Sequence, residues 1–295
     1  MIQQPETSPR LAVADGLVDV ACPLCQSTEY TEYVWAPSHY GPEKYRVTRC
    51  TACRMIYTNP QPVSYLQEVS NRGVLDRHFR PSKLTRLARV AMLVLSILAP
   101  QAAGRRVLDF GCGEGTFVAT AVDQGWDAVG TDLNAGLVHE ANRHWGFDRL
   151  HAGSLDDFAA TNPAPFDVIV SSQVFEHLQR PVESGRRLSD LLRPGGLVYI
   201  DVPNANQLGE WVSKGKTLDP TAHWNHFTVE TLSDLVRRMD LEVVSATGAP
   251  SLVNVYHDVG AGIAALPLAR MTRKVLPNIG SGACVIGRKP PELRV

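Results

Sequence analysis

Short apolar runs alternate with helical patterns from Arg105 to the end of the chain. Each run is four to six residues long and is followed by turn residues or by apolar positions at helical spacing, which is typical of strands alternating with helices. The predicted strands are Arg106–Phe110, Ala128–Asp132, Val168–Ser171, Leu197–Val202, Leu241–Ala246 and Ala283–Arg288. This order predicts an α/β fold with a doubly wound, mostly parallel sheet.

The residues before this region follow two other patterns. Within residues 63–100, apolar side chains recur every three or four positions, which predicts helix: Leu84, Leu87, Ala88, Ala91, Leu95 and Leu98. Residues 1–62 have little helical periodicity, and the Asn59–Pro62 stretch is predicted to be a linker because it carries two prolines. We therefore expect an N-terminal region at 1–62, a helical linker or cap at 63–100 and a main domain at 101–295.

Composition narrows the class of protein. The 295 residues are 44% hydrophobic, and 29 Lys and Arg balance 30 Asp and Glu, so the chain can fill a core and lacks the basic excess of phosphate-binding proteins. We recognise neither a secretory signal at the start nor an apolar run of the ~20 residues that cross a bilayer. We therefore expect a cytoplasmic protein with reduced thiols, no membrane span and no nucleic-acid partner.

Four of the six cysteines form two C-x-x-C pairs, Cys22 with Cys25 and Cys50 with Cys53. Four thiolates at this spacing suit tetrahedral Zn²⁺, and a β-hairpin between the pairs accommodates a gap slightly longer than is common. We predict a structural zinc ribbon, with disulfides as the alternative. Cys284 has no assigned chemistry, and Cys112 is predicted to be a packing residue.

A glycine-rich turn follows the first predicted strand. Gly111, Gly113 and Gly115 allow a sharp turn and a close approach of backbone to ligand before a helix that begins near Thr116. Asp109 precedes the turn, where a carboxylate repels pyrophosphate but favours an ammonium or sulfonium ligand. Asp132 ends the next strand, at a distance suited to ribose hydroxyls. The alternative is an unliganded turn in which Asp132 caps a helix.

The sequence resembles class I S-adenosylmethionine-dependent methyltransferases over about residues 100 to 290. Besides the turn and Asp132, the resemblance rests on the Gly153–Asp156, Phe166–Ser172, Val174–Leu178 and Leu192–Gly196 motifs. It implies S-adenosylmethionine as cofactor and a Rossmann-like, seven-stranded sheet closed by a reversed final strand. It also implies cofactor contacts from Ser154 and Leu155, where the third strand ends near the adenine, and from Ser172 after the fourth strand.

Two groups of residues are candidates for catalysis. Gln173, Glu176 and His177 fall on one face if their segment is helical, and they resemble a Glu-x-x-Glu-His metal site of ubiquinone-pathway O-methyltransferases, with Gln173 in place of the first Glu. His177 is therefore a metal ligand, a general base or substrate contact, or a residue that packs near the cofactor.

The second group is His223 and His226, in a long irregular stretch before a helix Val229–Met239 that Thr228 caps. Histidine suits proton abstraction near neutrality. The stretch resembles the Glu-His-x-x-Tyr-Phe-Ser segment of sugar C-methyltransferases, with Ala222 in place of Glu and His226 in place of Tyr. We expect His223 to be the base and His226 a substrate contact or second base; the alternative is that either histidine packs under the loop.

The predicted function is methyl transfer from S-adenosylmethionine to an O, C or N atom of a small molecule. A sugar or natural-product pathway is expected, because the N-terminal ribbon resembles that of a subset of such methyltransferases. An rRNA base methyltransferase and a non-catalytic S-adenosylmethionine-binding module are the alternatives. Residues 250–278 are predicted to cover the sheet, to contact a second copy of the chain or to form a lid over an apolar acceptor.

Overall fold

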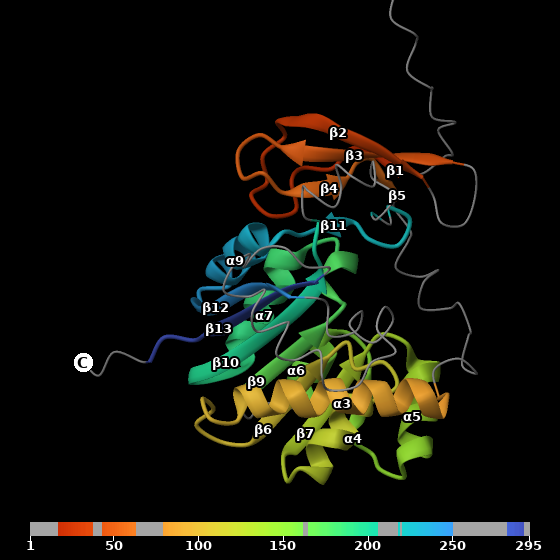
Figure 1. Ribbon diagram of the computed structural model, residues 1–295, viewed down its shortest axis with the longest axis vertical. Coiled ribbons are helices and arrows are strands. Elements are labelled where there is room, and N and C mark those ends of the chain that lie inside the picture. Colours follow the sequence, from red (N-terminus) through yellow and green to blue (C-terminus); the bar gives the residue numbers. More distant parts are fainter. Residues whose placement is uncertain are drawn as a thin grey trace, which may run out of the picture.

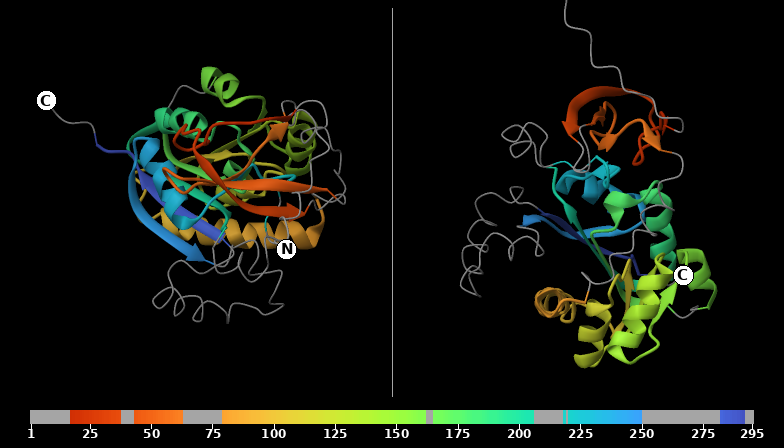
Figure 2. Two further views of the ribbon diagram at one scale, coloured as in Figure 1. Left: turned by 90° about the horizontal axis from the view of Figure 1, so that it is seen from above. Right: turned by 90° about the vertical axis from the view of Figure 1, so that its right-hand side faces the viewer.

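The computed structural model describes residues 17–37, 43–62, 79–161, 165–205, 218, 220–249 and 282–291. They form a large sheet with helices on both faces and a smaller antiparallel sheet stacked over one end of it (Figures 1 and 2). The predicted segment 250–278 and residues 63–78 of the predicted helical region lie outside the described residues. Within the described ranges, no helix is long and apolar enough to cross a membrane.

The large sheet has seven strands in the order β12-β13-β10-β9-β6-β7-β8. They are β6 (Arg106–Phe110), β7 (Asp127–Asp132), β8 (Leu150–Ala152), β9 (Phe166–Ser172), β10 (Leu192–Pro203), β12 (Glu242–Ala249) and β13 (Gly282–Arg288). β13 runs antiparallel to both of its neighbours, whereas β6 to β10 pair in parallel. The predicted α/β class and the reversed final strand are therefore confirmed.

Successive side chains of a strand point to opposite faces of the sheet, and each face is covered by its own set of helices. Val107, Val168 and Val170 are buried in a core with α3 (Pro81–Leu98), α4 (Thr116–Asp123) and α5 (Ala135–Trp145). Leu108 and Ile169, one position away, are buried in the opposite core with α6 (Leu155–Thr161), α7 (Pro181–Leu191) and α9 (Val229–Arg238). Both faces are covered, so the strands need near-continuous apolar runs. Thr228 caps α9 as predicted, through its side chain and the Thr231 backbone N–H.

The smaller sheet, which we call the ribbon sheet, has the order β11-β4-β3-β2. It contains β2 (Tyr30–Pro37), β3 (Lys44–Cys50), β4 (Ile56–Thr58) and β11 (Asn225–His226). β2 and β3 form the hairpin expected between the two cysteine pairs. β11 comes from the stretch predicted to be an irregular loop, and it pairs with β4 through Asn225–Tyr57 and His226–Ile56.

The predicted linker Asn59–Pro62 is instead part of the ribbon. β5 (Gln61–Pro62) pairs with β1 (Leu17–Val18), and Asn59 is fully buried with its side chain accepting a hydrogen bond from the Val20 N–H. Pro60 precedes β5, and Pro62 can end it because, among the described residues, this short strand pairs with β1 alone. Tyr57 and Met55 share one buried core with Phe175 and Phe227, so the ribbon packs directly on the large sheet's domain.

Candidate functional site

The glycine-rich turn leaves β6 at Phe110 and enters α4 at Thr116. Gly111, Gly113 and Gly115 have φ of 78°, 50° and 72°, a region that favours glycine. A Cβ on Gly111 would lie 2.3 Å from Val174 Cγ2 and one on Gly115 would lie 2.6 Å from Leu150 Cδ1, whereas one on Gly113 would meet no atom within 4 Å. The outer glycines therefore permit close packing, and the middle one faces an open cradle that can take a ligand.

Asp132 lies beside this cradle at the end of β7. One carboxylate oxygen accepts from the Gly113 N–H at 3.0 Å and the other from the Asn134 N–H at 2.9 Å. The N-cap of α5 is Asn134, whose side chain accepts from the Leu137 N–H. Asp132 is thus not the helix cap; it holds the turn, and the adjacent Leu133 side chain is 54% exposed.

Asp109 is buried at the carboxyl end of β6. Burial, together with the charges of Asp132 and Glu114, raises the pKa of Asp109 to about 8. In such a site, a cation next to Asp109 stabilises the charged form of the carboxylate. The nearby Lys83 of α3 contacts Glu114 at 3.2 Å, so α3 is tied to the same turn.

Cys112 lies inside the turn as a packing residue. It is buried, burial raises the pKa of its thiol, and a Cβ on Gly130 of β7 would lie 2.6 Å from the Cys112 Cβ. This close contact between the turn and β7 agrees with the packing role expected from the sequence.

The other residues that are predicted to contact the cofactor form hydrogen bonds or packing contacts within the protein. The exposed Ser154 hydroxyl donates to Asp157 at 2.6 Å at the start of α6, and Leu155 is half-buried against the core. Ser172 donates to Asp201, and the pKa of Asp201 is raised to about 6 because burial outweighs its hydrogen bonds with Ser172 and Gln173. Cofactor contacts by Ser154, Leu155 and Ser172 stay predictions.

The four ribbon cysteines converge at one point. All four sulfurs lie within 4.8 Å of one another, and Cys22–Cys53 and Cys25–Cys50 are each separated by 3.5 Å. These distances exclude disulfides, which need about 2.0 Å, and are close to the ~3.8 Å edge of a tetrahedron with Zn–S bonds of about 2.3 Å. Burial raises the thiol pKa of Cys22 and of Cys53, whereas hydrogen bonds from the backbone and the neighbouring cysteines lower that of Cys50 to about 7. A cation between the sulfurs would stabilise four thiolates at such short distances. The residues fit Zn²⁺.

Glu176, His177 and His223 form a second cluster, which we call the histidine cluster. Their ligand atoms lie within 4.8 Å of one another, and the two imidazole rings meet edge to face with centroids 4.9 Å apart. His177 belongs to the short helix η1 (Phe175–His177), which follows β9. Gln173 has a φ of 58° and lies outside η1, so Gln173 to His177 do not form one helix, which was the condition for Gln173, Glu176 and His177 to share a face.

Hydrogen bonding orients the histidine cluster. A carbonyl can only accept, so the contact of 2.7 Å between His177 Nδ1 and the Ala222 O places a proton on Nδ1. His177 Nε2 then lies 3.8 Å from Glu176 Oε1. Glu176 is 1% exposed, and its burial raises its pKa well above the ordinary value. Such a cluster can exchange a proton with a substrate or hold a divalent cation.

His226 does not belong to the histidine cluster. It is 4% exposed in β11, and its Nε2 is 3.1 Å from the buried Thr58 hydroxyl. The structure therefore brings His177 and His223 together and gives His226 a contact with the ribbon. Its role as a substrate contact or second base stays a prediction.

Sequence reasoning missed two residues that build this region. Thr58 contacts the segment around His223, and the Asn225 side chain donates to the Phe175 O at 2.9 Å and the Leu178 O at 2.6 Å. Asn225 had a signal, since a polar residue between Trp224 and Phe227 is expected to be buried and hydrogen-bonded. Thr58 had none, because its partners are distant in the chain.

Comparison with known proteins agrees with this geometry. A family model described as "Methyltransferase domain" matches residues 77–246. A ubiquinone biosynthesis O-methyltransferase of Ruegeria pomeroyi is 32% identical over 162 residues, which cover 50% of this chain and 63% of that protein. A probable S-adenosylmethionine-dependent methyltransferase of Mycolicibacterium smegmatis is 31% identical over 175 residues, covering 59% of this chain and 63% of that protein.

The chain thus spans less than two thirds of the length of these curated relatives. Among solved structures, a SAM-dependent methyltransferase from Archaeoglobus fulgidus shares the fold at 18% identity with a TM-score of 0.50, covering 68% of this chain and 94% of that chain. The residues that the family model matches include the glycine turn, Asp132 and the histidine cluster. The matched residues are more than half of the chain, and the chain belongs to this family of methyltransferase domains.

Proposed function

We propose that this methyltransferase moves the methyl group of S-adenosylmethionine to an O, C or N atom of a small molecule in a sugar or natural-product pathway, with His223 as the general base. The observation that carries the proposal is the edge-to-face pair of His177 and His223 next to the carboxyl end of β9. Ligands of open α/β sheets bind at the carboxyl ends of the strands.

The glycine turn and its acids would hold the cofactor. Asp109 would face the positive end, Asp132 would accept hydrogen bonds from ribose hydroxyls, and the exposed Leu133 would cover part of the adenine. Gly113 would leave room for backbone contact, with Ser154, Leu155 and Ser172 around the nucleoside. When bound, S-adenosylmethionine supplies a methyl group on a sulfonium, which a nucleophile can displace.

The protein's contribution at the acceptor is to position the nucleophile and to take its proton. His223 would remove that proton, and His177, whose Nδ1 is held by the Ala222 carbonyl, would support the His223 ring. A single well-placed base can suffice, because positioning provides much of the rate enhancement. In this proposal the buried His226 contributes through its contact with Thr58.

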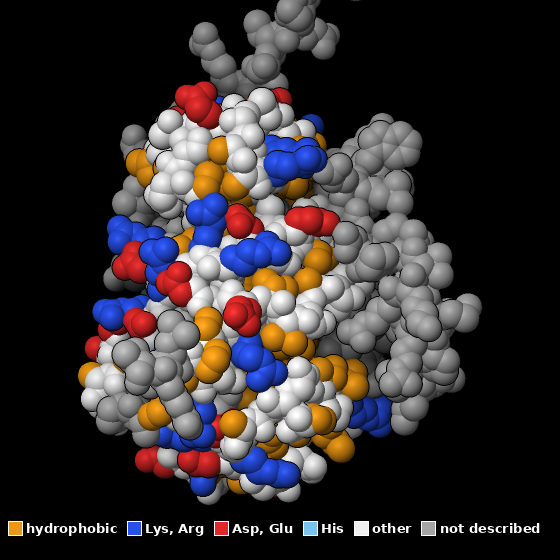
Figure 3. Space-filling view, turned by 90° about the vertical axis from the view of Figure 1, so that its left-hand side faces the viewer, with side chains coloured by type: hydrophobic (Ala, Val, Ile, Leu, Met, Phe, Trp, Pro, Cys, Tyr) orange, Lys and Arg blue, Asp and Glu red, His pale blue; other side chains and the backbone are white. Residues whose placement is uncertain are grey.

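Two observations support a small acceptor. The curated relatives named above include an O-methyltransferase of ubiquinone biosynthesis, which is a small-molecule pathway. On the face drawn in Figure 3, Lys and Arg side chains are interspersed with Asp and Glu, without the continuous basic surface that nucleic-acid binding favours. A structural zinc ion in the cysteine cluster would complete the ribbon.

The test is methyl transfer from labelled S-adenosylmethionine to pools of sugar nucleotides, phenols and amines, followed by mass spectrometry of the products. We expect labelled product from one pool, and a loss of turnover with unchanged cofactor affinity in His223→Ala. Turnover that His223→Ala leaves intact would overturn the base assignment. Activity that is abolished by EDTA and restored by Mg²⁺ would assign the histidine cluster to a cation instead. Salt-sensitive transfer to RNA alone would overturn the small-molecule proposal.

A further inference from the structure

The segment that carries His223 is bonded to the ribbon by the pairing of β11 with β4 and by the residue that ends β4, Thr58. Thr58, the last residue of β4, is fully buried. Its hydroxyl donates to the His223 O at 3.2 Å, its N–H donates to the Trp224 O at 3.0 Å, and its hydroxyl lies 3.1 Å from His226 Nε2. Thr58 thus contacts three of the four residues from His223 to His226, and the fourth, Asn225, pairs with Tyr57 of β4.

These contacts fix the protons of the Thr58 hydroxyl and of His226. The hydroxyl has one hydrogen, and it goes to the His223 carbonyl, which can only accept. The hydroxyl oxygen must then accept from His226, so His226 Nε2 carries the proton in this contact. His226 acts here as a hydrogen-bond donor to the ribbon, and Thr58 connects the His226 ring with the His223 backbone.

On its other side, the same segment is bonded to η1. The Trp224 N–H donates to the Glu176 O at 2.8 Å, and the Ala222 O accepts from His177 Nδ1. Asn225 adds its two bonds to the backbone around η1. His223 therefore sits in a segment held between the ribbon and η1, and its ring meets His177 of η1.

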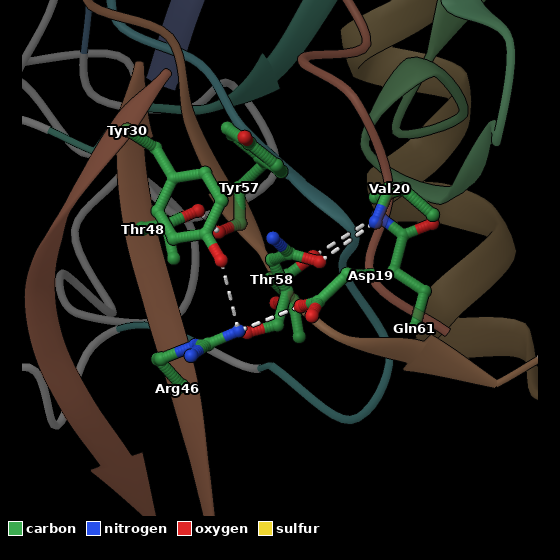
Figure 4. A network of polar contacts seen from close by, with 9 residues as sticks. Asp19, Val20, Tyr30, Arg46, Thr48, Tyr57, Thr58 and Gln61 are labelled. Atoms are coloured by element: carbon green, nitrogen blue, oxygen red, sulfur yellow. Dashed lines mark hydrogen bonds and ion pairs between the residues drawn. The ribbon is translucent and has the colours of Figure 1, made fainter. Parts of the chain in front are cut away.

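Thr58 is itself held firmly by the ribbon, as Figure 4 shows. Its carbonyl accepts from Gln61 Nε2 at 3.1 Å, and the neighbouring Tyr57 O accepts from the Thr48 hydroxyl at 3.1 Å. Arg46 Nε donates to the Asn59 O at 2.7 Å, and the same guanidinium contacts Asp19 and Tyr30. A side chain anchored in this way can transmit the ribbon's geometry to the residues that it contacts.

We propose that Thr58 is a positioning residue, which sets the placement of His223 beside His177 and makes the ribbon part of the acceptor site's framework. The proposal rests on the proposed role of His223 in proton transfer. Thr58 touches no reacting atom in this scheme; it acts through the His223 backbone and the His226 ring.

The test compares Thr58→Val, Thr58→Ser and Thr48→Val in the full chain. Valine keeps the shape of threonine and removes the hydroxyl, and serine keeps the hydroxyl. Thr48→Val is the matched control, because Thr48 is equally buried in the neighbouring strand and its hydroxyl also donates to a backbone carbonyl, but to that of Tyr57. All three variants are first compared with the parent for folding, zinc content and cofactor affinity.

Two measurements do not need the acceptor. Hydrogen exchange over residues 222–228 should quicken by about fivefold in Thr58→Val, since one buried hydrogen bond contributes on the order of 1 kcal/mol. The ring NMR signals of His177 and His223 should shift in the same variant because their edge-to-face contact changes. Thr58→Ser and Thr48→Val should leave both measurements near the parent's values.

With the acceptor found in the pools above, kcat should fall by about 10- to 100-fold in Thr58→Val, with the KM for S-adenosylmethionine unchanged. Unchanged exchange, ring signals and kcat in Thr58→Val would overturn the positioning role, as would equal effects in Thr48→Val. If the ring signals shift but His223→Ala keeps full turnover, the proposed base is wrong whereas the structural coupling holds, so the two failures are distinguishable.

Discussion

The proposed active site has two halves, a cofactor half and an acceptor half, which are built in different ways. The cofactor half consists of a continuous turn, Asp109 to Gly115, and of the end of β7, where the Thr131 carbonyl and the Asp132 carboxylate accept hydrogen bonds from the turn. The acceptor half joins Thr58 of the ribbon to His223 and His226, which lie 165 and 168 residues away in the chain. One half depends on local backbone geometry and the other on long-range contacts.

This difference has a physical consequence. The turn from β6 to α4 is bonded to β7 and keeps its shape as long as the large sheet is folded, whereas β11 needs the ribbon as its pairing partner. Damage to the ribbon should therefore affect the acceptor half and spare the cofactor half. The predictions below test this separation, beginning with the largest expected effect.

Removal of the ribbon's metal should abolish methyl transfer. In Cys50→Ser, or after stripping of zinc by a strong chelator, the four-sulfur cluster cannot close, and a structural zinc site contributes about 10–16 kcal/mol in isolated zinc-binding peptides. We expect transfer to fall below detection while the affinity for S-adenosylmethionine changes by less than about threefold. Metal analysis, the methyl-transfer assay and calorimetric titration of the cofactor measure the zinc content, the transfer and the cofactor affinity.

Cys284→Ser is the control for this experiment, because Cys284 is a half-buried residue of β13 outside the cluster. It should retain zinc and activity. A parent protein that contains no zinc after expression with the metal would contradict the structural zinc site. Loss of cofactor affinity together with zinc would contradict the independence of the two halves.

His223→Ala should lower kcat by about 10²- to 10⁴-fold, the range of a general base. The substitution acts only on the acceptor half, so the cofactor affinity should stay at the parent's value. His139→Ala, at an exposed position of α5, is the matched control and should keep full activity. A rise in the acceptor KM with an unchanged kcat would instead make His223 a binding residue.

The same contrast explains what the sequence could predict. Six of the seven strands of the large sheet were recognisable from their apolar runs, whereas β8, with three residues, was too short to show one. Gly111 to Gly115 were recognisable because their spacing is local. The position of β11 was not, since a two-residue strand between Trp224 and Phe227 carries no periodicity and its partner lies in the ribbon. The prolines near Asn59 were misread as a linker, because sequence alone does not show that β5 pairs only with β1.

Asp132→Ala should weaken S-adenosylmethionine binding by about 10- to 100-fold, because hydrogen bonds to a charged group contribute about 1.5–3 kcal/mol. The variant loses the carboxylate that organises the turn through Gly113 as well as the proposed ribose contacts. Asp127→Ala is the matched control at the other end of β7, where the exposed carboxylate contacts Arg149 at 3.2 Å. Calorimetric titration should show equal cofactor affinity in Asp127→Ala and the parent; equal weakening in both variants would point to a general effect on β7.

Asp109→Asn should raise the thermal stability of the ligand-free protein and weaken cofactor binding. Burial and the charges of Asp132 and Glu114 raise the pKa of Asp109 from 3.8 to about 8. The folded state therefore holds this proton more tightly than the unfolded state does, and the parent loses stability as the pH rises from about 4 to about 8. Asparagine cannot ionise and avoids that loss.

The Tm advantage of Asp109→Asn should accordingly be small at pH 5, grow with pH and reach about 3–8 °C at pH 8.5. Added S-adenosylmethionine should reverse the order of the two proteins, because only the parent offers a carboxylate to the cofactor's positive charge. Differential scanning calorimetry at several pH values, with and without cofactor, measures both effects. A Tm difference that is the same at every pH would show that Asp109 ionises normally in the folded protein, and the cradle would then lack the buried charge site that distinguishes it from an ordinary strand-to-helix turn.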